Sequence, residues 1–191
     1  MSHLLIQGHP RTESFCAALG DAWMQGVTEA GGQAERVNLI ELSFDPILRG
    51  GFDGEQQLEP DLRSLQARIA AASHVTFAFP TWWAGAPALV KGFVDRTFLP
   101  GWAFQNRSGQ ALPDGLLAGR SARVITTMDS PWWWYWLAHR RSVHRAFVTA
   151  TLKYCGIKDV RETTVFGVRA LDDAGRAAAL ERARRAGAAD A

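Results

Sequence analysis

Apolar runs bounded by turn residues alternate along this chain with segments whose apolar positions recur at helical spacing. The apolar runs predict strands at residues 3–8, 34–40, 74–79, 121–127 and 161–168. The intervening segments predict helices at residues 14–30, 59–72, 86–98, 135–154 and 172–187. Regular alternation of strand and helix is typical of a parallel sheet with helices on both faces. Because such crossovers are right-handed, the pattern predicts a three-layer α/β/α sandwich.

Two segments stand apart from this alternation. Residues 43–58 have no clear period and contain three glycines, which is typical of an extended surface loop. The segment from residue 173 onward is rich in Ala and Arg, and we expect it to be a closing helix that frays. No internal repeat or interdomain linker is evident, so residues 1–191 are expected to form one domain.

Composition and charge exclude several classes of protein. Hydrophobic residues make up 47% of the chain and charged residues 21%, which is ordinary for a globular protein. The formal net charge of +2 is too small to indicate nucleic-acid binding. No apolar run approaches the roughly 20 residues that span a bilayer, and the first residues do not resemble a signal peptide. We therefore expect a cytoplasmic protein without membrane insertion.

The two cysteines give no sign of a metal site or a disulfide. Cys16 and Cys155 are far apart in the sequence and lack the spacing of zinc ligands. We expect both to act as small buried hydrophobes, and we expect no metal.

The loop after the first predicted strand has the features of an anion site. An open parallel sheet binds its ligand beyond the carboxyl ends of its strands, where the strand order reverses. In "GHPRTESF" (8–15), Ser14 is a candidate N-cap, and the first amides of the following helix favour a phosphate. His9 and Arg11 add possible donors. An ordinary capped strand-to-helix connection has the same composition, and the GxGxxG and P-loop motifs are missing.

The loop after the third strand presents aromatic side chains at the same edge of the sheet. Pro80 ends the strand, and Trp82 and Trp83 follow it on the loop. Aromatic side chains held in this position offer a wall for a flat ring system. Gly92, in the next helix, is expected to let the backbone of a partner subunit approach closely.

Five aromatic residues occur in a row in "SPWWWYW" (130–136), directly after the fourth strand. Successive helical residues are about 100° apart, so these five cannot all face one side. Asp129 is a candidate N-cap for this helix. We expect at least one of residues 132–134 to face the ligand slot or a dimer interface.

Three segments together resemble a known family. "HPRTESF" (9–15), "FPTWWAGAPALVKGFVDRTFLPGWAF" (79–104) and "TLKYCGI" (151–157) are similar, in order and spacing, to flavodoxin-like NAD(P)H:quinone oxidoreductases. This group includes the DT-diaphorase type, the bacterial modulator-of-drug-activity type and the ancillary subunits of glutathione-gated potassium efflux systems. The resemblance implies a five-stranded parallel sheet of order 2-1-3-4-5, a bound flavin (FMN or FAD), NAD(P)H as donor and quinone-type acceptors. It also implies a homodimer with each active site at the subunit interface.

The resemblance also implies which residues contact the flavin. Carried over one by one, His9, Ser14 and Phe15 hold the phosphate end, Pro80, Thr81 and Trp83 line the isoalloxazine ring, and Thr126 and Thr127 approach its pyrimidine side. The remaining predicted flavin contacts are Cys16, Trp82, Met128 and Asp129. Cys16 occupies a position where the family often has Asn. Met128 and Asp129 replace the Gly-Gly turn of many members, which singles out this loop as a place where substrate choice differs.

In the DT-diaphorase type, a Tyr and a His after the fourth strand assist catalysis. Tyr135 and His139 are the nearest candidates here, although their spacing differs from that of the family. An alternative for His139 is a solvated place on the basic helix face "LAHRRSVHR", and His144 is a weaker candidate.

These features predict a flavin-dependent NAD(P)H oxidoreductase that reduces quinones or similar flat acceptors by two-electron hydride transfer. A single slot that admits the nicotinamide first and the acceptor next implies a ping-pong cycle. An alternative is a flavin-binding regulatory subunit in peripheral contact with a potassium-efflux transporter. A flavodoxin-type electron carrier is disfavoured, because such carriers are usually acidic and this chain carries a net charge of +2.

Overall fold

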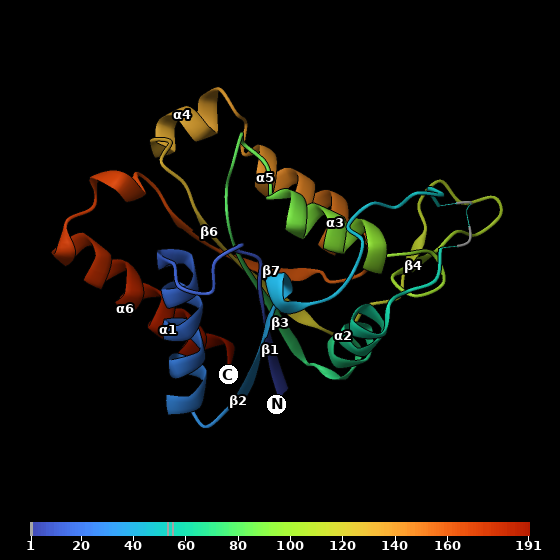
Figure 1. The fold of residues 1–191 in the computed structure, drawn as a ribbon, viewed down its shortest axis with the longest axis horizontal. Helices are drawn as coiled ribbons and strands as arrows, with labels where there is room; N and C mark the ends of the chain where they lie inside the picture. The colour runs from blue at the N-terminus through green and yellow to red at the C-terminus, as the bar shows by residue number, and fades with distance from the viewer. Residues whose placement is uncertain (1, 53, 55) are drawn as a thin grey trace.

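A central sheet of five parallel strands organises the molecule (Figure 1). The computed structural model describes residues 2–52, 54 and 56–191. The strands are β1 (Ser2–Gln7), β2 (Gln33–Asn38), β3 (His74–Pro80), β6 (Ser121–Thr127) and β7 (Asp159–Val165), in the spatial order β2-β1-β3-β6-β7. The five predicted strands, their parallel pairing and their order are confirmed, with small shifts at the strand ends.

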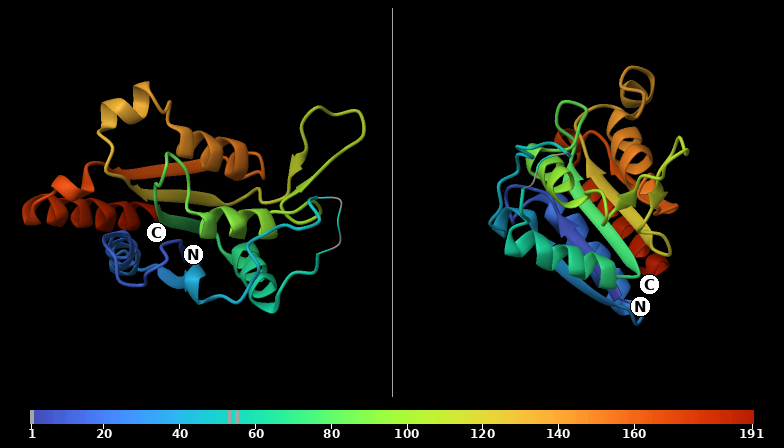
Figure 2. Two further views of the ribbon diagram at one scale, coloured as in Figure 1. Left: turned by 45° about the horizontal axis from the view of Figure 1, so that its top comes forward. Right: turned by 90° about the vertical axis from the view of Figure 1, so that its right-hand side faces the viewer.

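Helices cover both faces of the sheet, as predicted (Figure 2). Helices α1 (Phe15–Glu29) and α6 (Asp173–Asp190) pack on one face around Trp23 and Leu5. Helices α2 (Pro60–Ala71) and α3 (Ala88–Thr97) pack on the other face around Phe77 and Phe93. Strand β3 is buried along its whole length because it lies in the middle of the sheet between both layers.

The helix predicted over residues 135–154 is not continuous, so that prediction is wrong in part. The structure has α4 (Trp132–Leu137), α5 (Ser142–His144) and a π-helical segment (Arg145–Lys153). Between α4 and α5 the backbone turns at Arg140 and Arg141, whose φ angles are 49° and 56°. Periodicity carries no signal for a left-handed turn at two arginines, because the apolar spacing resumes after it.

Short elements outside the five-stranded sheet were also missed by the pattern. A two-stranded antiparallel hairpin pairs β4 (Phe104–Gln105) with β5 (Asp114–Gly115). Two 3₁₀ turns, η1 (Leu39–Glu41) and η3 (Val168–Ala170), follow β2 and β7. Elements this short carry too few alternating positions to be read from sequence.

The predicted surface loop at 43–58 is fastened to α3 by a buried arginine. The guanidinium of Arg96 is buried and donates to the carbonyl oxygens of Asp45 at 2.6 Å and Gln57 at 2.9 Å. A Cβ on Gly92 would lie 2.4 Å from Pro46 Cβ. The close approach predicted at Gly92 is therefore to this loop of the same chain, which corrects the expectation of a partner subunit there. Residues 53 and 55 of the predicted loop lie outside the described residues.

Helix α6 is a packed element, and the expectation that it frays is wrong. Gly26 of α1 and Gly187 of α6 lie where the two helix backbones touch. A Cβ on Gly26 would lie 1.8 Å from the carbonyl oxygen of Arg184, and one on Gly187 would lie 1.9 Å from that of Trp23. Small residues let the backbones of α1 and α6 pack closely. This close contact stabilises α6 although the helix has few large apolar side chains.

A buried cluster of charged and polar groups lies at the amino ends of the strands, around Asp190 of α6. The side chain of Asp190 is fully buried. It accepts hydrogen bonds from Trp23 Nε1 at 2.8 Å, from Arg123 Nη2 at 2.8 Å and from Arg161 Nη1 at 2.7 Å. His74 Nε2 lies 3.5 Å from the same carboxylate. Two arginines and an indole therefore hold α6 to α1, β6 and β7 through one carboxylate.

Acid is expected to weaken the fold through this cluster. Burial lowers the pKa of His74 from 6.5 to about 4, although the charge of Asp190 opposes the shift. The unfolded chain takes up a proton at His74 below about pH 6.5 and the folded chain does not, so stability falls as the pH drops from 6.5 to 4. Thermal unfolding midpoints measured across this range should show a shallower pH dependence in His74→Gln. An identical slope in the variant would contradict this role of His74.

Candidate functional site

Two adjoining hollows open at the carboxyl ends of β1, β3 and β6, where the sheet's strand order reverses. The first, called here the β1 hollow, has a volume of about 260 Å³ and runs from the loop after β1 to the start of η3. The second, called the α4 hollow, has a volume of about 500 Å³ and lies between α4 and the loop after β3. The residues that line both are Thr81, Trp82, Met128 and Asp129.

Most of the residues predicted to contact a ligand line one or both hollows. The β1 hollow is lined by His9, Ser14, Phe15, Cys16, Pro80, Thr81, Trp82, Thr127, Met128 and Asp129. The α4 hollow adds Trp83, Tyr135 and His139 to this set. Three loops far apart in the sequence are therefore brought to one place by the order of the strands.

One predicted residue is not brought to the hollows. Thr126 is fully buried, its hydroxyl lies 3.2 Å from that of Thr164, and it lines neither hollow. Conversely, Val168 and Arg169 line the β1 hollow and were missed. They follow the last strand, where the sequence offers no Gly-rich or aromatic signal.

The start of α1 forms one end of the β1 hollow. Ser14 caps this helix, since its hydroxyl accepts from the amide of Ala17 at 3.1 Å, which confirms the predicted N-cap. His9 Nδ1 accepts from the amide of Arg11 at 2.9 Å. Burial lowers the pKa of His9, so its imidazole is neutral at pH 7 and keeps Nε2–H as a donor. Helix amides and a neutral imidazole donor suit an anionic group such as a phosphate.

One polar side-chain atom at the site has no partner within the described part of the chain. Thr81 Oγ1 is buried and lines both hollows. Gln7 lines neither hollow, and its amide donates to Cys16 Sγ, which lines the β1 hollow, at 3.6 Å. Burial raises the pKa of Cys16 to about 12, so its thiol stays protonated at neutral pH. A buried polar atom without a partner costs free energy, which a ligand with matching hydrogen-bonding groups would recover.

The loop after β3 contains a tight turn between Trp82 and Gly85. The two residues exchange backbone hydrogen bonds, each 2.9 Å long. Trp83 and Ala84, the central residues, have φ angles of 50° and 59°, which are costly for residues with side chains. The turn leaves the side chain of Trp83 fully exposed, whereas Trp82 packs edge-to-face on His9. Backbone strain of this kind is typical of residues at functional sites.

Tyr135 is the buried member of the aromatic run, and its hydroxyl partner is His144. Tyr135 Oη lies 2.6 Å from His144 Nδ1, and His144 Nε2 lies 3.1 Å from Thr164 Oγ1. Burial raises the pKa of Tyr135 and lowers that of His144, so both groups are neutral at pH 7. His139 lines the same hollow as Tyr135, with ring centroids 6.3 Å apart. The left-handed turn at residues 140–141 brings His144 back beside the phenol.

The remaining expectations for the loop after β6 need correction. Asp129 does not cap α4, because its carboxylate pairs with Arg169 Nε at 3.0 Å and accepts from the Arg169 amide at 3.0 Å. The N-cap position of α4 is Pro131, without a side-chain hydrogen bond. None of residues 132–134 lines either hollow, and all three side chains are exposed, so the expectation that one of them faces the ligand slot is wrong. The alternative, that one of them faces a dimer interface, stays a prediction.

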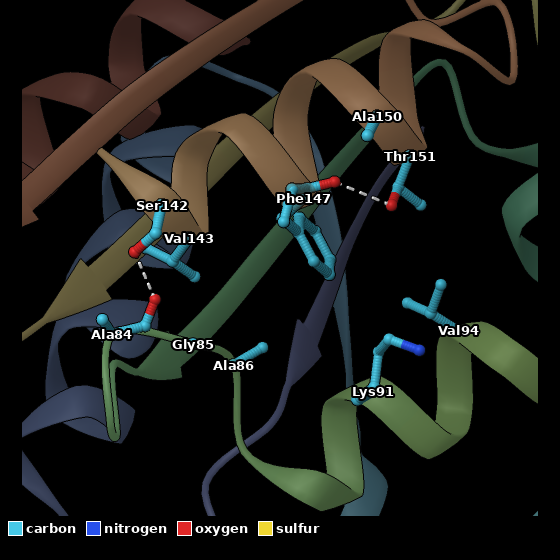
Figure 3. A pocket seen from close by; sticks show the side chains of 11 residues that line it. Ala84, Gly85, Ala86, Lys91, Val94, Ser142, Val143, Phe147, Ala150 and Thr151 are labelled. Carbon is cyan, nitrogen blue, oxygen red and sulfur yellow. Dashed lines mark hydrogen bonds between the residues drawn. The ribbon is translucent and has the colours of Figure 1, made fainter. Parts of the chain in front are cut away.

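A third, mostly apolar hollow of about 510 Å³ lies between α3 and the helical segment that follows α4 (Figure 3). Val94 and Phe147 lie along it. Ser142 Oγ donates to the carbonyl oxygen of Ala84 at 2.5 Å, and Ala84 also lines the α4 hollow. The apolar hollow is therefore connected through this loop to the candidate site.

Two other kinds of feature are absent from the described residues. In the described ranges, no group of three or more His, Cys, Asp or Glu side chains is arranged to hold a metal ion. Within those same ranges, no helix combines the length and apolar character needed to cross a membrane.

Comparisons with known proteins assign this architecture to a family. Residues 1–186 match a family model described as having a flavodoxin-like fold. The chain is 29% identical over 194 residues to an uncharacterized NAD(P)H oxidoreductase from Haemophilus influenzae, covering 96% of this chain and 92% of that protein. It is 30% identical over 179 residues to the ribosyldihydronicotinamide dehydrogenase (quinone) of Homo sapiens, covering 81% and 77%.

A solved structure gives the same result. The NAD(P)H:quinone oxidoreductase from Methanothermobacter marburgensis superimposes with a TM-score of 0.83 at 26% identity, covering 98% of each chain. Against four other curated relatives, this chain spans 44% to 57% of the relative's length.

Proposed function

We propose, from the premise that this chain belongs to the flavodoxin-like fold family, that it is a flavin-dependent NAD(P)H oxidoreductase that reduces quinones. One observation carries the proposal. The β1 hollow and the α4 hollow adjoin at the carboxyl ends of the strands, and they share the buried, unpartnered hydroxyl of Thr81 among the described residues. A flavin presents a phosphate-bearing tail and a flat ring with a polar edge, and the two hollows offer one environment for each.

The β1 hollow supplies the groups that would hold the flavin phosphate. These are the first amides of α1 behind the Ser14 cap and the neutral imidazole of His9. Phe15 lines the same hollow, and its ring lies 5.0 Å from the guanidinium carbon of Arg176. Thr81 Oγ1 and the backbone of the loop after β3 would meet the polar edge of the ring.

When bound, the flavin supplies the hydride-transfer chemistry, and this chain supplies binding, orientation and protons. The α4 hollow admits a second flat molecule between Trp82 and Tyr135. A nicotinamide and then a quinone would occupy this place in turn, which corresponds to a ping-pong cycle. Because both molecules would use this one α4 hollow, the proposal favours binding in succession over binding at the same time.

Tyr135 is proposed as the residue that provides a proton. A quinone that accepts a hydride equivalent needs one proton to become a hydroquinone, and Tyr135 keeps its phenolic proton because burial raises its pKa. His144, between Tyr135 and Thr164, fixes the orientation of the hydroxyl. His139 lines the same hollow and is a second candidate for a contact with the substrate.

Tyr135→Phe is expected to lower kcat by about tenfold or more while flavin occupancy stays the same. The substitution keeps the ring that fills the core and removes only the hydroxyl. Tyr154→Phe is a matched control, because the chain has two tyrosines and Tyr154 lines neither hollow. Steady-state rates with NAD(P)H and a quinone would measure both variants, and an unchanged kcat in Tyr135→Phe would remove this residue from the mechanism.

A second copy of the chain is proposed to cover the apolar hollow between α3 and the π-helical segment. The hollow is open, mostly apolar and linked to the site through Ala84 (Figure 3). A homodimer formed there would complete the wall of each site, in keeping with the dimer that the family resemblance implies.

The proposed cofactor is tested by reconstitution. The purified chain should bind FMN or FAD after incubation, and chromatography of the flavin released by heat should identify which one it retains. Failure to retain either flavin would contradict the proposal.

A further inference from the structure

Helix α4 exposes an unusual amount of aromatic surface at the edge of the molecule. Four of its six residues are tryptophans, and all four are exposed, by 63%, 48%, 47% and 53% for Trp132, Trp133, Trp134 and Trp136. Leu137, the last residue of α4, is exposed by 74%. The helix stands clear of the sheet and of the other helices in Figures 1 and 2. Exposed apolar patches of this kind mark interaction sites.

The directions of these tryptophans favour a lipid bilayer over a folded protein as the partner of α4. Successive helical residues turn by about 100°, so the four indoles point around most of the circumference of α4. Tyr135, which is buried, occupies the one side that faces the protein. A rigid protein partner would cover one side of so short a helix and leave the other indoles in water. A lipid interface surrounds all of them, and tryptophan is enriched at membrane–water interfaces.

The charges beside α4 indicate the kind of lipid. Residues 130–153 contain four Arg and Lys side chains and no Asp or Glu. Arg140 and Arg145 are exposed, and neither forms an ion pair with another described residue. Arg141 lies 4.7 Å from the ring of Trp136 and pairs with Glu162. Basic side chains directly beside exposed indoles are complementary to anionic headgroups.

We propose that α4, together with Arg140 and Arg145, called here the α4 surface, docks on an anionic lipid bilayer. Helix α4 has six residues and is far shorter than the roughly 20 needed to span a bilayer, so it would lie among the headgroups. Tyr135 and His139 line the α4 hollow beside this surface, so docking holds the hollow near the lipid. Resting on the proposed function, this position makes a quinone dissolved in the bilayer the acceptor class.

Co-sedimentation with lipid vesicles tests the docking without any turnover. The purified holoprotein should sediment with vesicles of phosphatidylcholine containing about one-third phosphatidylglycerol, and far less with pure phosphatidylcholine or at high salt. Trp132→Ser/Trp133→Ser and Arg140→Glu/Arg145→Glu should each weaken partitioning by about tenfold or more. None of these four residues lines the candidate site.

Matched controls separate the α4 surface from general effects of apolarity and charge. Leu112 and Leu137 are exposed by 73% and 74%, so Leu112→Ser should leave partitioning unchanged whereas Leu137→Ser weakens it. Arg63→Glu/Arg185→Glu makes the same charge change on α2 and α6 and should have a smaller effect. Equal losses of vesicle partitioning in the two charge variants would show that net charge alone causes the attraction, and would overturn the proposal.

A second copy of the chain is the alternative partner for the α4 surface. The oligomeric state, measured by sedimentation without lipid, distinguishes this partner from a bilayer. If Trp132→Ser/Trp133→Ser converts a dimer to a monomer and wild-type protein ignores the vesicles, the α4 surface is a protein interface and the proposal fails. With a working oxidoreductase, the same variant should slow turnover of a long-chain quinone in vesicles and spare that of a short, water-soluble quinone. Vesicle binding is measured without substrate, so failure of the enzymatic proposal would not affect that result.

Discussion

Replacing Asp190 with Ala is expected to lower the free energy of unfolding by about 3–5 kcal/mol. The carboxylate is fully buried and accepts from Arg123, Arg161 and Trp23. Its removal leaves the buried guanidinium of Arg123 without a counter-charge and detaches α6 from the sheet. For a chain of this size, the unfolding midpoint should fall by on the order of 10 °C.

A surface pair of the same chemistry serves as the control. Asp21 pairs with Arg36 where its side chain is 58% exposed, so Asp21→Ala should cost less than about 1 kcal/mol. Chemical denaturation with a shared slope for all three proteins would measure both differences. Equal stability of Asp190→Ala and wild type would show that the buried cluster does not hold α6.

Ser14→Asp is expected to weaken flavin binding by tenfold to a hundredfold, or about 1.4–2.8 kcal/mol. Asp caps helices as well as Ser does, so the bond to the Ala17 amide is kept and α1 remains capped. The new negative charge would lie at the end of the β1 hollow where the flavin phosphate is proposed to bind. Fluorescence titration of the flavin-free protein with FMN or FAD would measure the loss.

Ser64→Asp provides the same change of charge on an exposed position of α2, away from the hollows. It should leave flavin affinity unchanged. If the two variants bind flavin equally well, the phosphate is not held at the start of α1, and the orientation of the cofactor proposed above is wrong.

The fold was predictable because its determinants are local. The central strands β1, β3 and β6 carry apolar runs, and helices α1, α2 and α3 carry buried apolar positions at helical spacing, so the alternation predicts three layers. Helix α6 was misjudged because its packing depends on the absence of side chains. Gly26 and Gly187 allow a close helix–helix contact that a search for apolar faces does not register.

The candidate site was predictable to the extent that strand order fixes which loops meet. The residues after β1, β3 and β6 line the two hollows because parallel strands end at one edge. The partner of Tyr135 was not predictable, since it depends on positive φ angles at Arg140 and Arg141. The contribution of Val168 and Arg169 was missed because it arises from tertiary proximity and not from a motif.

The central claim is that the two hollows hold a flavin that a nicotinamide reduces and a quinone reoxidises. Anaerobic titration of the flavin-loaded protein with NADH or NADPH tests it most directly. We predict that the visible absorbance of the bound flavin bleaches with about one equivalent of reduced nicotinamide and returns when a quinone is added. A bound flavin that neither nicotinamide bleaches, or a reduced flavin that no quinone reoxidises, would contradict the account.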